Sequence, residues 1–323
     1  MKNPIFDLLS DPAISDIFVN GFRRIYCERN GKIEHCDVSF ESNDDLYDFV
    51  VKSLEGAKIK FSEKTQYYDL RLADGSRMNV VMPPAAVDGI CVSIRKPSGN
   101  ILGPDDLVKR NTLTEEALGL LKVCVEKRKN IVISGGTGSG KTTLLNLLSS
   151  FISPAERIIT IEDAAELRLP QEHVVRLEAR FSSCSGEGTT IRQLVINALR
   201  MRPDRIVVGE CRGGEALDML VAMNTGHNGS LTTVHSNSTR DALKRIEVMC
   251  LMSGIELPVK AIREQISSAI DFIVQVARFA DGSRKVTEII QVFGLEGETI
   301  TSARLFKIES GVLTSTGISP VFS

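Results

Sequence analysis

One glycine-rich stretch constrains this chain more than any other feature. Residues 133–148 read ISGGTGSGKTTLLNLL, with an apolar run before the glycines and a helix-forming run after them, and they contain the pattern GxxxxGK[ST]. Glycines let the backbone curl so that successive N–H groups point inward at phosphate oxygens, while the N-terminus of the following helix adds partial positive charge. This context predicts a phosphate-binding P-loop on a strand–turn–helix unit rather than a glycine-rich turn that binds nothing.

The P-loop pattern assigns expected roles to individual residues. Lys141 should reach the β and γ phosphates of ATP, and the Thr142 hydroxyl should ligate Mg²⁺. The expected cofactor-binding residues of the loop are Gly135, Gly136, Thr137, Gly138, Ser139, Gly140, Lys141, Thr142 and Thr143.

The patterning on the two sides of residue 100 predicts two domains. The first hundred residues alternate short β-type runs with turns at Asn30-Gly31 and 74–76, typical of an α+β module with an antiparallel sheet. Later, helical stretches alternate with continuously apolar runs such as RIITIED and RIVVGE, which favour a parallel sheet covered on both faces. We therefore expect a smaller α+β N-terminal domain over 1–100, a linker over 101–113 and an α/β P-loop ATPase domain over 114–323.

Acidic residues end two of the apolar runs. Glu162 and Asp163 follow RIITI, and Glu210 ends RIVVGE. The carboxyl ends of parallel strands form the crevice where α/β sheets bind ligands, so one acid can hold hydrated Mg²⁺ while another orients or deprotonates water. Spacing does not say which does which. The alternative is that these acids are satisfied strand ends, paired with Arg168 or Arg212.

The stretch TGHNGSLTTVHSN, residues 225–237, holds two of the four histidines. A metal site on His227 and His235 would need further ligands that this stretch does not offer. SLTTV is typical of another parallel strand, which would bring Thr232, Thr233 and His235 out beside the phosphates. There they could sense the nucleotide state through a γ-phosphate hydrogen bond, with a purely structural role as the alternative. His227 is a further nucleotide-binding candidate.

Composition counts against some classes of protein. A net charge of −2 gives no basic excess for holding nucleic acid or an anionic membrane, so we expect no specific nucleic-acid partner. Seven scattered cysteines without a CxxC pair suit a reducing compartment and predict neither disulfides nor a zinc knuckle. The sequence has no run apolar and long enough to span a membrane and no secretory signal, which predicts a cytoplasmic or peripheral protein.

The motifs together resemble a known family. The segments ISGGTGSGKTTLLNLLSSFI, ERIITIEDAAELRL and NALRMRPDRIVVGECRGGEALDMLVAMNTGHNGSLTTVHSNSTRDALKRIE are similar to the secretion-superfamily traffic ATPases, specifically the CpaF or TadA type that drives Tad (Flp) pilus assembly. ISDIFVNG, DLRLADGSRMNVVMPP and SIRKPS resemble that family's N-terminal domain, and the likeness continues through AIREQISSAIDFIVQVARFADGSRKVTEI. It covers nearly the whole chain. The four-cysteine metal module of the type II secretion relatives is absent here.

The resemblance implies a homo-hexamer at the cytoplasmic face of the inner membrane. Each subunit would join a small, PAS-like N-terminal domain to a RecA-like ATPase domain, with ATP bound between them and a membrane platform protein as partner. It labels TIED an Asp box, the strand ending in Glu210 a Walker B element and 225–237 a His box. The arginines that it implies at the phosphates or at interfaces are Arg71, Arg77 and Arg95 in the N-terminal domain, and Arg200 and Arg202 ahead of Walker B.

These expectations define a Mg²⁺-dependent ATPase that powers assembly or retraction of a pilus, or a secretion step. Glu210, Glu162, Lys141 and His235 are its expected catalytic residues, and Thr142, Glu210 and Asp163 its expected metal-binding residues. Three alternatives stay open: a conjugative or type IV secretion ATPase, a nucleic-acid motor, and an ATP-dependent switch that needs no ring.

Overall fold

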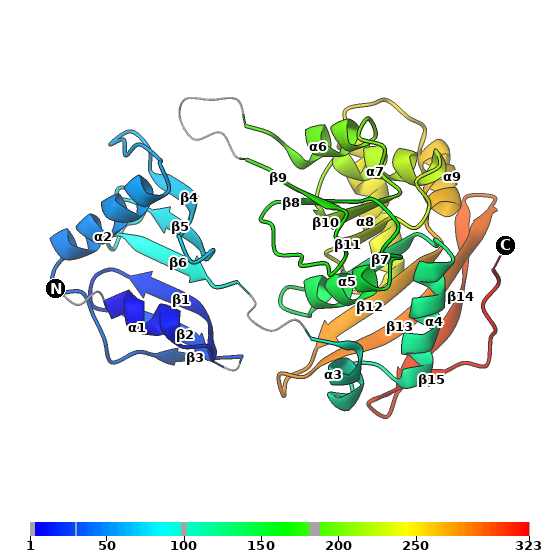
Figure 1. Ribbon diagram of the computed structural model, residues 1–323, viewed down its shortest axis with the longest axis horizontal. Coiled ribbons are helices and arrows are strands. Elements are labelled where there is room, and N and C mark those ends of the chain that lie inside the picture. Colours follow the sequence, from blue (N-terminus) through cyan, green and yellow to red (C-terminus); the bar gives the residue numbers. More distant parts are fainter. Residues whose placement is uncertain (1–3, 30, 98–101, 181–187, 323) are drawn as a thin grey trace. The chain divides into compact units, whose positions relative to one another are not determined.

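The computed structural model describes residues 4–29, 31–97, 102–180 and 188–322. The described residues fall into two compact units, the first ending at residue 97 and the second beginning at residue 102. Asn30, at one expected hairpin tip, and Cys184 lie outside the described residues. Figure 1 shows the elements of both units.

The N-terminal unit is an antiparallel sheet with two helices. Its strand order is β3-β2-β1-β6-β5-β4, and β1, β4, β5 and β6 alternate buried residues with more exposed ones. The turn expected at 74–76 joins β4 to β5 and is held by Asp74, which accepts hydrogen bonds from the N–H and hydroxyl of Ser76. The elements are α1 (Pro4–Ser10), β1 (Ile14–Asn20), β2 (Ile25–Arg29), β3 (Lys32–His35), α2 (Asn43–Gly56), β4 (Tyr67–Arg71), β5 (Arg77–Val81) and β6 (Cys91–Arg95).

The second unit is built on a nine-stranded sheet of order β15-β14-β13-β12-β7-β11-β10-β8-β9. Pairing is parallel from β12 to β9 and antiparallel from β12 to β15, so a parallel core carries an antiparallel extension. The sequence patterns did not predict this extension. The strands are β7 (Ile131–Gly135), β8 (Ile158–Glu162), β9 (Val174–Glu178), β10 (Arg205–Cys211), β11 (Leu231–Val234), β12 (Phe272–Arg278), β13 (Arg284–Glu296), β14 (Thr299–Glu309) and β15 (Val312–Ser315).

Helices cover both faces of this sheet, which explains why its central strands are apolar throughout. Val132, Ile161 and Val208 pack against α6–α9, while Ile131, Ile133 and neighbouring strand residues pack against α3–α5. The helices are α3 (Pro104–Lys109), α4 (Glu115–Glu126), α5 (Lys141–Ser150), α6 (Ile191–Ala198), α7 (Glu215–Asn224), α8 (Thr239–Leu251) and α9 (Val259–Ala269).

The segment expected to be a linker, 101–113, differs from that expectation. From residue 102 it belongs to the second unit, and it forms α3. Pro104 begins the helix, the Asp106 side chain accepts a hydrogen bond from the N–H of Gly103, and Leu107 and Leu113 are buried in the core. Two leucines with apolar surface to bury hold this segment on the domain.

No helix within the described ranges is both long and apolar enough to cross a bilayer.

Candidate nucleotide-binding site

The predicted P-loop connects β7 to α5 and is shaped by glycines that other residues could not replace. Gly138 and Gly140 have φ values of +67° and +97°, in the left-handed region. A Cβ on Gly135 would lie 2.5 Å from the Ser139 hydroxyl oxygen and would also meet the carbonyl oxygen of Val276. The loop therefore depends on missing side chains for its tight curl.

Polar side chains close the same loop from within. Lys141 donates from Nζ to the carbonyl oxygens of Gly135 and Gly136, each at 2.9 Å, and the Ser139 hydroxyl donates to Gly136 at 2.9 Å. The lysine ammonium thus lies against the backbone of the loop, next to the N-terminus of α5. Thr142 and Thr143 follow in the first turn of that helix, half-buried. This cradle fits a polyphosphate, since it combines a cation, a helix N-terminus and a curled backbone.

The predicted acids meet at the carboxyl edge of the same sheet. Arg212 bridges two of them: its Nη2 lies 2.6 Å from Glu210 Oε2 and its Nη1 lies 3.2 Å from Asp163 Oδ2. The Glu210 and Asp163 carboxylates thus share the positive charge of one side chain. A pair of carboxylates so placed is also the environment that Mg²⁺ needs. The described residues contain no group of three or more metal-ligating side chains. Proteins hold Mg²⁺ through one or two carboxylates plus substrate phosphates, and Glu210 and Asp163 offer two carboxylates beside the P-loop edge.

Glu162 occupies a different environment from Glu210. Its side chain is buried, and Oε1 accepts hydrogen bonds from the N–H groups of Glu166 (3.0 Å) and Leu167 (2.9 Å). Oε2 is buried with no hydrogen-bond partner among the described residues. Burial raises the pKa of this carboxyl to about 7. One oxygen of Glu162 therefore fixes the turn after β8, and the group holds a proton far more readily than an exposed glutamate.

The predicted strand in the histidine stretch is β11, which lies between β7 and β10. His235 follows it and is exposed at the carboxyl edge. The expectation that Thr232 and Thr233 face the phosphates is wrong, because both side chains are buried in the sheet. The Thr233 hydroxyl instead donates to the carbonyl oxygen of Gly209 at 2.7 Å, beside Glu210.

A second contact ties the end of β11 to the P-loop strand. The hydroxyls of Ser236 and Ser134 hydrogen-bond to each other, one residue after His235 and one residue before Gly135. The segment carrying His235 is therefore joined by hydrogen bonds to both neighbouring strands. A displacement of His235 would therefore disturb the hydrogen bonds to the P-loop strand β7 and to β10, the strand of Glu210.

Three predicted nucleotide-binding residues lie elsewhere in this unit. His227 precedes β11, whereas His235 follows it, so the strand separates them and puts His227 at the amino edge of the sheet. Arg200 and Arg202 precede β10 and lie at that same edge. Because the P-loop lies at the carboxyl edge, the chain does not bring these three residues to its own P-loop, and their role in nucleotide binding or at an interface stays a prediction.

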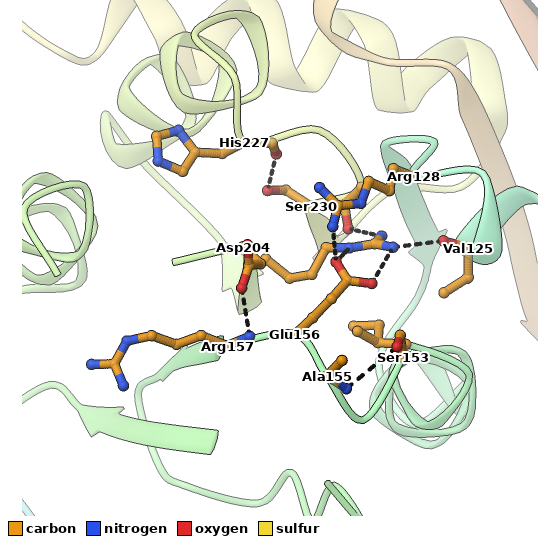
Figure 2. Close-up of polar contacts among 12 residues, drawn as sticks. Val125, Arg128, Ser153, Ala155, Glu156, Arg157, Asp204, His227 and Ser230 are labelled. Atoms are coloured by element: carbon orange, nitrogen blue, oxygen red, sulfur yellow. Dashed lines mark hydrogen bonds and ion pairs between the residues drawn. The ribbon is translucent and has the colours of Figure 1, made fainter. Parts of the chain in front are cut away.

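The amino edge holds a buried ion-paired cluster that the motifs did not predict. Arg205, at the start of β10, is 1% exposed and donates to both carboxylate oxygens of Glu156, at 2.6 and 3.2 Å. Two further N–H groups of the guanidinium donate to the carbonyl oxygens of Gly229 and Val125, at 3.0 and 2.9 Å. The His227 ring points away from this cluster (Figure 2). The sequence signal that could have predicted this cluster is Arg205 itself, a charged residue at the start of an apolar strand.

The three predicted arginines of the N-terminal unit form one row. Arg71 lies opposite Arg77 across β4 and β5, and Arg77 lies opposite Arg95 across β5 and β6. Directly opposed residues of antiparallel strands share a face, and like charges there are unfavourable. Arg77 also contacts Asp69 at 3.3 Å. The row lies on the face opposite buried Leu70 and Met78, and Asp16, opposite Arg95 on β1, continues it with an acid.

Comparison with known proteins places these features in context. A family model described as "Type II/IV secretion system protein" matches residues 1–306. A putative conjugal transfer protein of Mycobacterium tuberculosis is 34% identical over 299 residues, covering 90% of this chain and 84% of the relative. The type IV secretion system protein VirB11 of Bartonella quintana is 32% identical over 325 residues, covering 88% and 90%.

Two solved structures share the fold. The Legionella pneumophila ATPase DotB matches with a TM-score of 0.60 and 20% identity, over 90% of this chain and 81% of that one. The pilus retraction motor PilT with bound ADP matches with a TM-score of 0.61 and 20% identity, over 98% and 83%. The predicted α/β fold, a RecA-like ATPase domain with a smaller N-terminal domain, is confirmed.

Proposed function

The chain belongs to the type II/IV secretion system protein family, and from this membership we propose that it is a Mg²⁺-dependent ATPase that works as a ring motor for secretion or pilus assembly. The observation that carries the proposal is the meeting of four predicted features at one sheet edge. These are the P-loop, the Glu210–Asp163 pair, the turn held by Glu162 and the exposed His235.

The P-loop side of the site binds and orients the nucleotide. The curled backbone from Gly135 to Gly140 presents N–H groups to phosphate oxygens, and Lys141 exchanges its two carbonyl contacts for phosphate oxygens. Thr142 and Asp163 would hold the metal ion. Mg²⁺, when bound, neutralises charge on the phosphates. Because Arg212 occupies the space between Glu210 and Asp163, it must release at least Asp163 for this to happen.

The acid side of the site divides its work between the two glutamates. We assign Glu210 as the group that orients or deprotonates water. Its carboxylate is half-buried, and its ion pair among the described residues is with the exposed Arg212, so it can turn toward a ligand. Glu162 is assigned to positioning, because one of its oxygens is committed to two backbone N–H groups.

Motion follows from the state of the γ-phosphate. His235 donates a hydrogen bond to it when ATP is bound and loses that partner after hydrolysis, and the Ser236–Ser134 and Thr233–Gly209 contacts pass the change to the neighbouring strands. The row of Arg71, Arg77 and Arg95 supplies positive charge from the N-terminal unit as the ring of six closes. The amino-edge arginines Arg200 and Arg202 and His227 then belong to subunit or partner contacts.

The machine that the motor serves has two candidates. The motif resemblance favours a Tad (Flp) pilus, with an inner-membrane platform protein as partner and the cytoplasmic face as the location. The printed names of the relatives favour conjugal transfer or another type IV secretion step instead. Pull-down with membrane platform proteins of each system distinguishes the two.

The test of the proposed function uses the Glu210→Gln protein. We expect it to bind ATP with Mg²⁺ without turnover and, by light scattering, to assemble into a six-subunit particle when Mg-ATP is added. Lys141→Ala is the matched control, which should neither bind ATP nor assemble. A Glu210→Gln protein that binds ATP yet stays monomeric at every concentration would refute the ring motor and leave an ATP-dependent switch.

A further inference from the structure

The hairpin between β12 and β13 brings two arginines to the P-loop that none of the nucleotide-binding motifs contains. Arg278 ends β12, Arg284 begins β13, and the two are direct cross-strand partners. Arg284 donates from Nε to the carbonyl oxygen of Gly138 at 2.9 Å. Its Cδ lies 3.4 Å from the position of a Cβ on Gly140, and Arg278 Nη1 lies 3.4 Å from that of a Cβ on Gly138.

The position of this hairpin is fixed by the sheet rather than by a loose loop. β12 pairs in parallel with β7, with Val276 opposite Gly135, so the hairpin neck emerges beside the P-loop. The turn is closed by hydrogen bonds from Phe279 N–H to the Ser283 carbonyl (2.8 Å) and from the Ser283 N–H and hydroxyl to Asp281 Oδ1 (2.9 and 2.6 Å). Arg284 is thus presented from a hydrogen-bonded hairpin.

The bonded carbonyl has a direct consequence for the phosphate cradle. In a planar trans peptide the carbonyl of Gly138 and the N–H of Ser139 point in opposite directions. Holding that carbonyl outward therefore aims the Ser139 N–H into the loop. There it donates to the Gly136 carbonyl, at 3.4 Å, a long bond that a phosphate oxygen can replace.

From this geometry we propose that Arg284 is a positioning residue for nucleotide binding. Its Nε–H, bound to the outer side of the P-loop, presets the Ser139 N–H for a phosphate oxygen of the nucleotide held by the same subunit. The inference rests on the proposed nucleotide site, and it assigns Arg284 a hydrogen-bonding role rather than direct contact between its charge and the phosphates.

Side-chain lengths make the hydrogen-bonding role separable from a charge role. Glutamine places its amide nitrogen the same number of bonds from the backbone as arginine Nε, so Arg284→Gln keeps the donor and removes the charge. Arg284→Lys keeps the charge and places a methylene at that point. Lys285→Ala is the matched control, because it removes one charge from the same strand, where the Lys285 ammonium donates to the Gly311 carbonyl at 2.8 Å.

The experiment measures ADP affinity by calorimetry and the kcat and KM for ATP on the full chain. We expect Arg284→Ala to weaken ADP binding roughly tenfold and to raise KM by a similar factor with kcat within about twofold, since ground-state and transition-state binding are lost equally. Arg284→Gln should restore most of the affinity, and Arg284→Lys should restore little. Lys285→Ala should bind as wild type, and all four variants should unfold at the wild-type temperature within a few degrees.

Each contrary outcome has a distinct meaning. Rescue by lysine and not by glutamine would replace the positioning role with a charge role and overturn the proposal. Wild-type affinity in Arg284→Ala, with binding lost in Lys141→Ala, would overturn it while leaving the nucleotide site intact. If wild type binds no ADP, or Lys141→Ala binds it normally, the proposed function and this inference both fail.

Discussion

The two edges of the large sheet handle charge in opposite ways. At the amino edge, the buried Arg205 side chain donates four hydrogen bonds to protein groups, two of them to the carboxylate oxygens of Glu156. At the carboxyl edge, the exposed Arg212 joins Glu210 to Asp163, and Lys141 rests on two carbonyl groups. Contacts of the second kind are readily exchanged for a ligand. The polar groups of the amino edge therefore stabilise the fold, whereas those of the carboxyl edge are available to bind a ligand.

The largest effect should come from the carboxyl edge. Replacing Glu210 with Gln removes the group that activates water, and steady-state phosphate release should fall by between about 100- and 10,000-fold. Glu162→Gln keeps the oxygen that accepts two backbone N–H groups and should keep turnover within about tenfold of wild type. If the two variants fall by equal factors, the division of work between the glutamates is wrong and both carboxylates act on the reaction.

The amino edge should respond in stability instead. Among the described residues, Arg205→Met leaves the buried Glu156 with Arg128 as its ionic partner, at 3.0 Å, and the free energy of unfolding should fall by about 3–5 kcal/mol. The control is Arg128→Met, which removes a half-exposed partner of the same carboxylate and should cost about 1 kcal/mol or less. Urea unfolding measures both. Equal losses of unfolding free energy in the two variants would show that burial does not determine how strongly an ion pair with Glu156 stabilises the fold.

Glu162 is a buried group at the carboxyl edge, so the pH dependence of stability also tests the comparison between the two edges. Its pKa is raised to about 7 in the folded chain, so the folded state holds the proton that the unfolded state releases near the ordinary value of 4.5. The stability contributed by the protonated form is complete below about pH 4.5 and is lost as pH rises through about 7.

Glu162→Gln mimics the protonated carboxyl at every pH. Relative to wild type it should be unchanged near pH 4.5 and more stable at pH 8, by up to about 3 kcal/mol for a shift of this size. Urea unfolding at the two pH values gives the comparison. A stability difference that does not change with pH would mean that Glu162 titrates normally in the folded chain.

Sequence patterns predicted the carboxyl edge far better than the amino edge, for a physical reason. Strand ends and loop motifs are local, so Lys141, Glu210 and His235 could be placed without knowing the rest of the fold. The partner of Arg205 is Glu156, 49 residues away, and Arg284 reaches Gly138 across 146 residues. Such pairs depend on sheet order, which periodicity does not contain. The same limit explains why Arg71, Arg77 and Arg95 could be selected but not aligned, and why His227 was placed beside the phosphates.

The smallest effect should come from residues 225–237, the stretch that carries His227 before β11 and His235 after it. His235→Ala removes a single hydrogen bond to the γ-phosphate, so it should weaken binding of a non-hydrolysable ATP analogue about fivefold while leaving ADP affinity unchanged. His227→Ala, at the amino edge, should change neither affinity in the isolated subunit. Calorimetric titrations of both variants give the ratio of the two affinities. A fall in ADP affinity with His235→Ala would assign this histidine to the nucleotide as a whole rather than to its γ-phosphate. A loss on His227→Ala that appears only under assembling conditions would place the amino edge of one subunit against the nucleotide of the next.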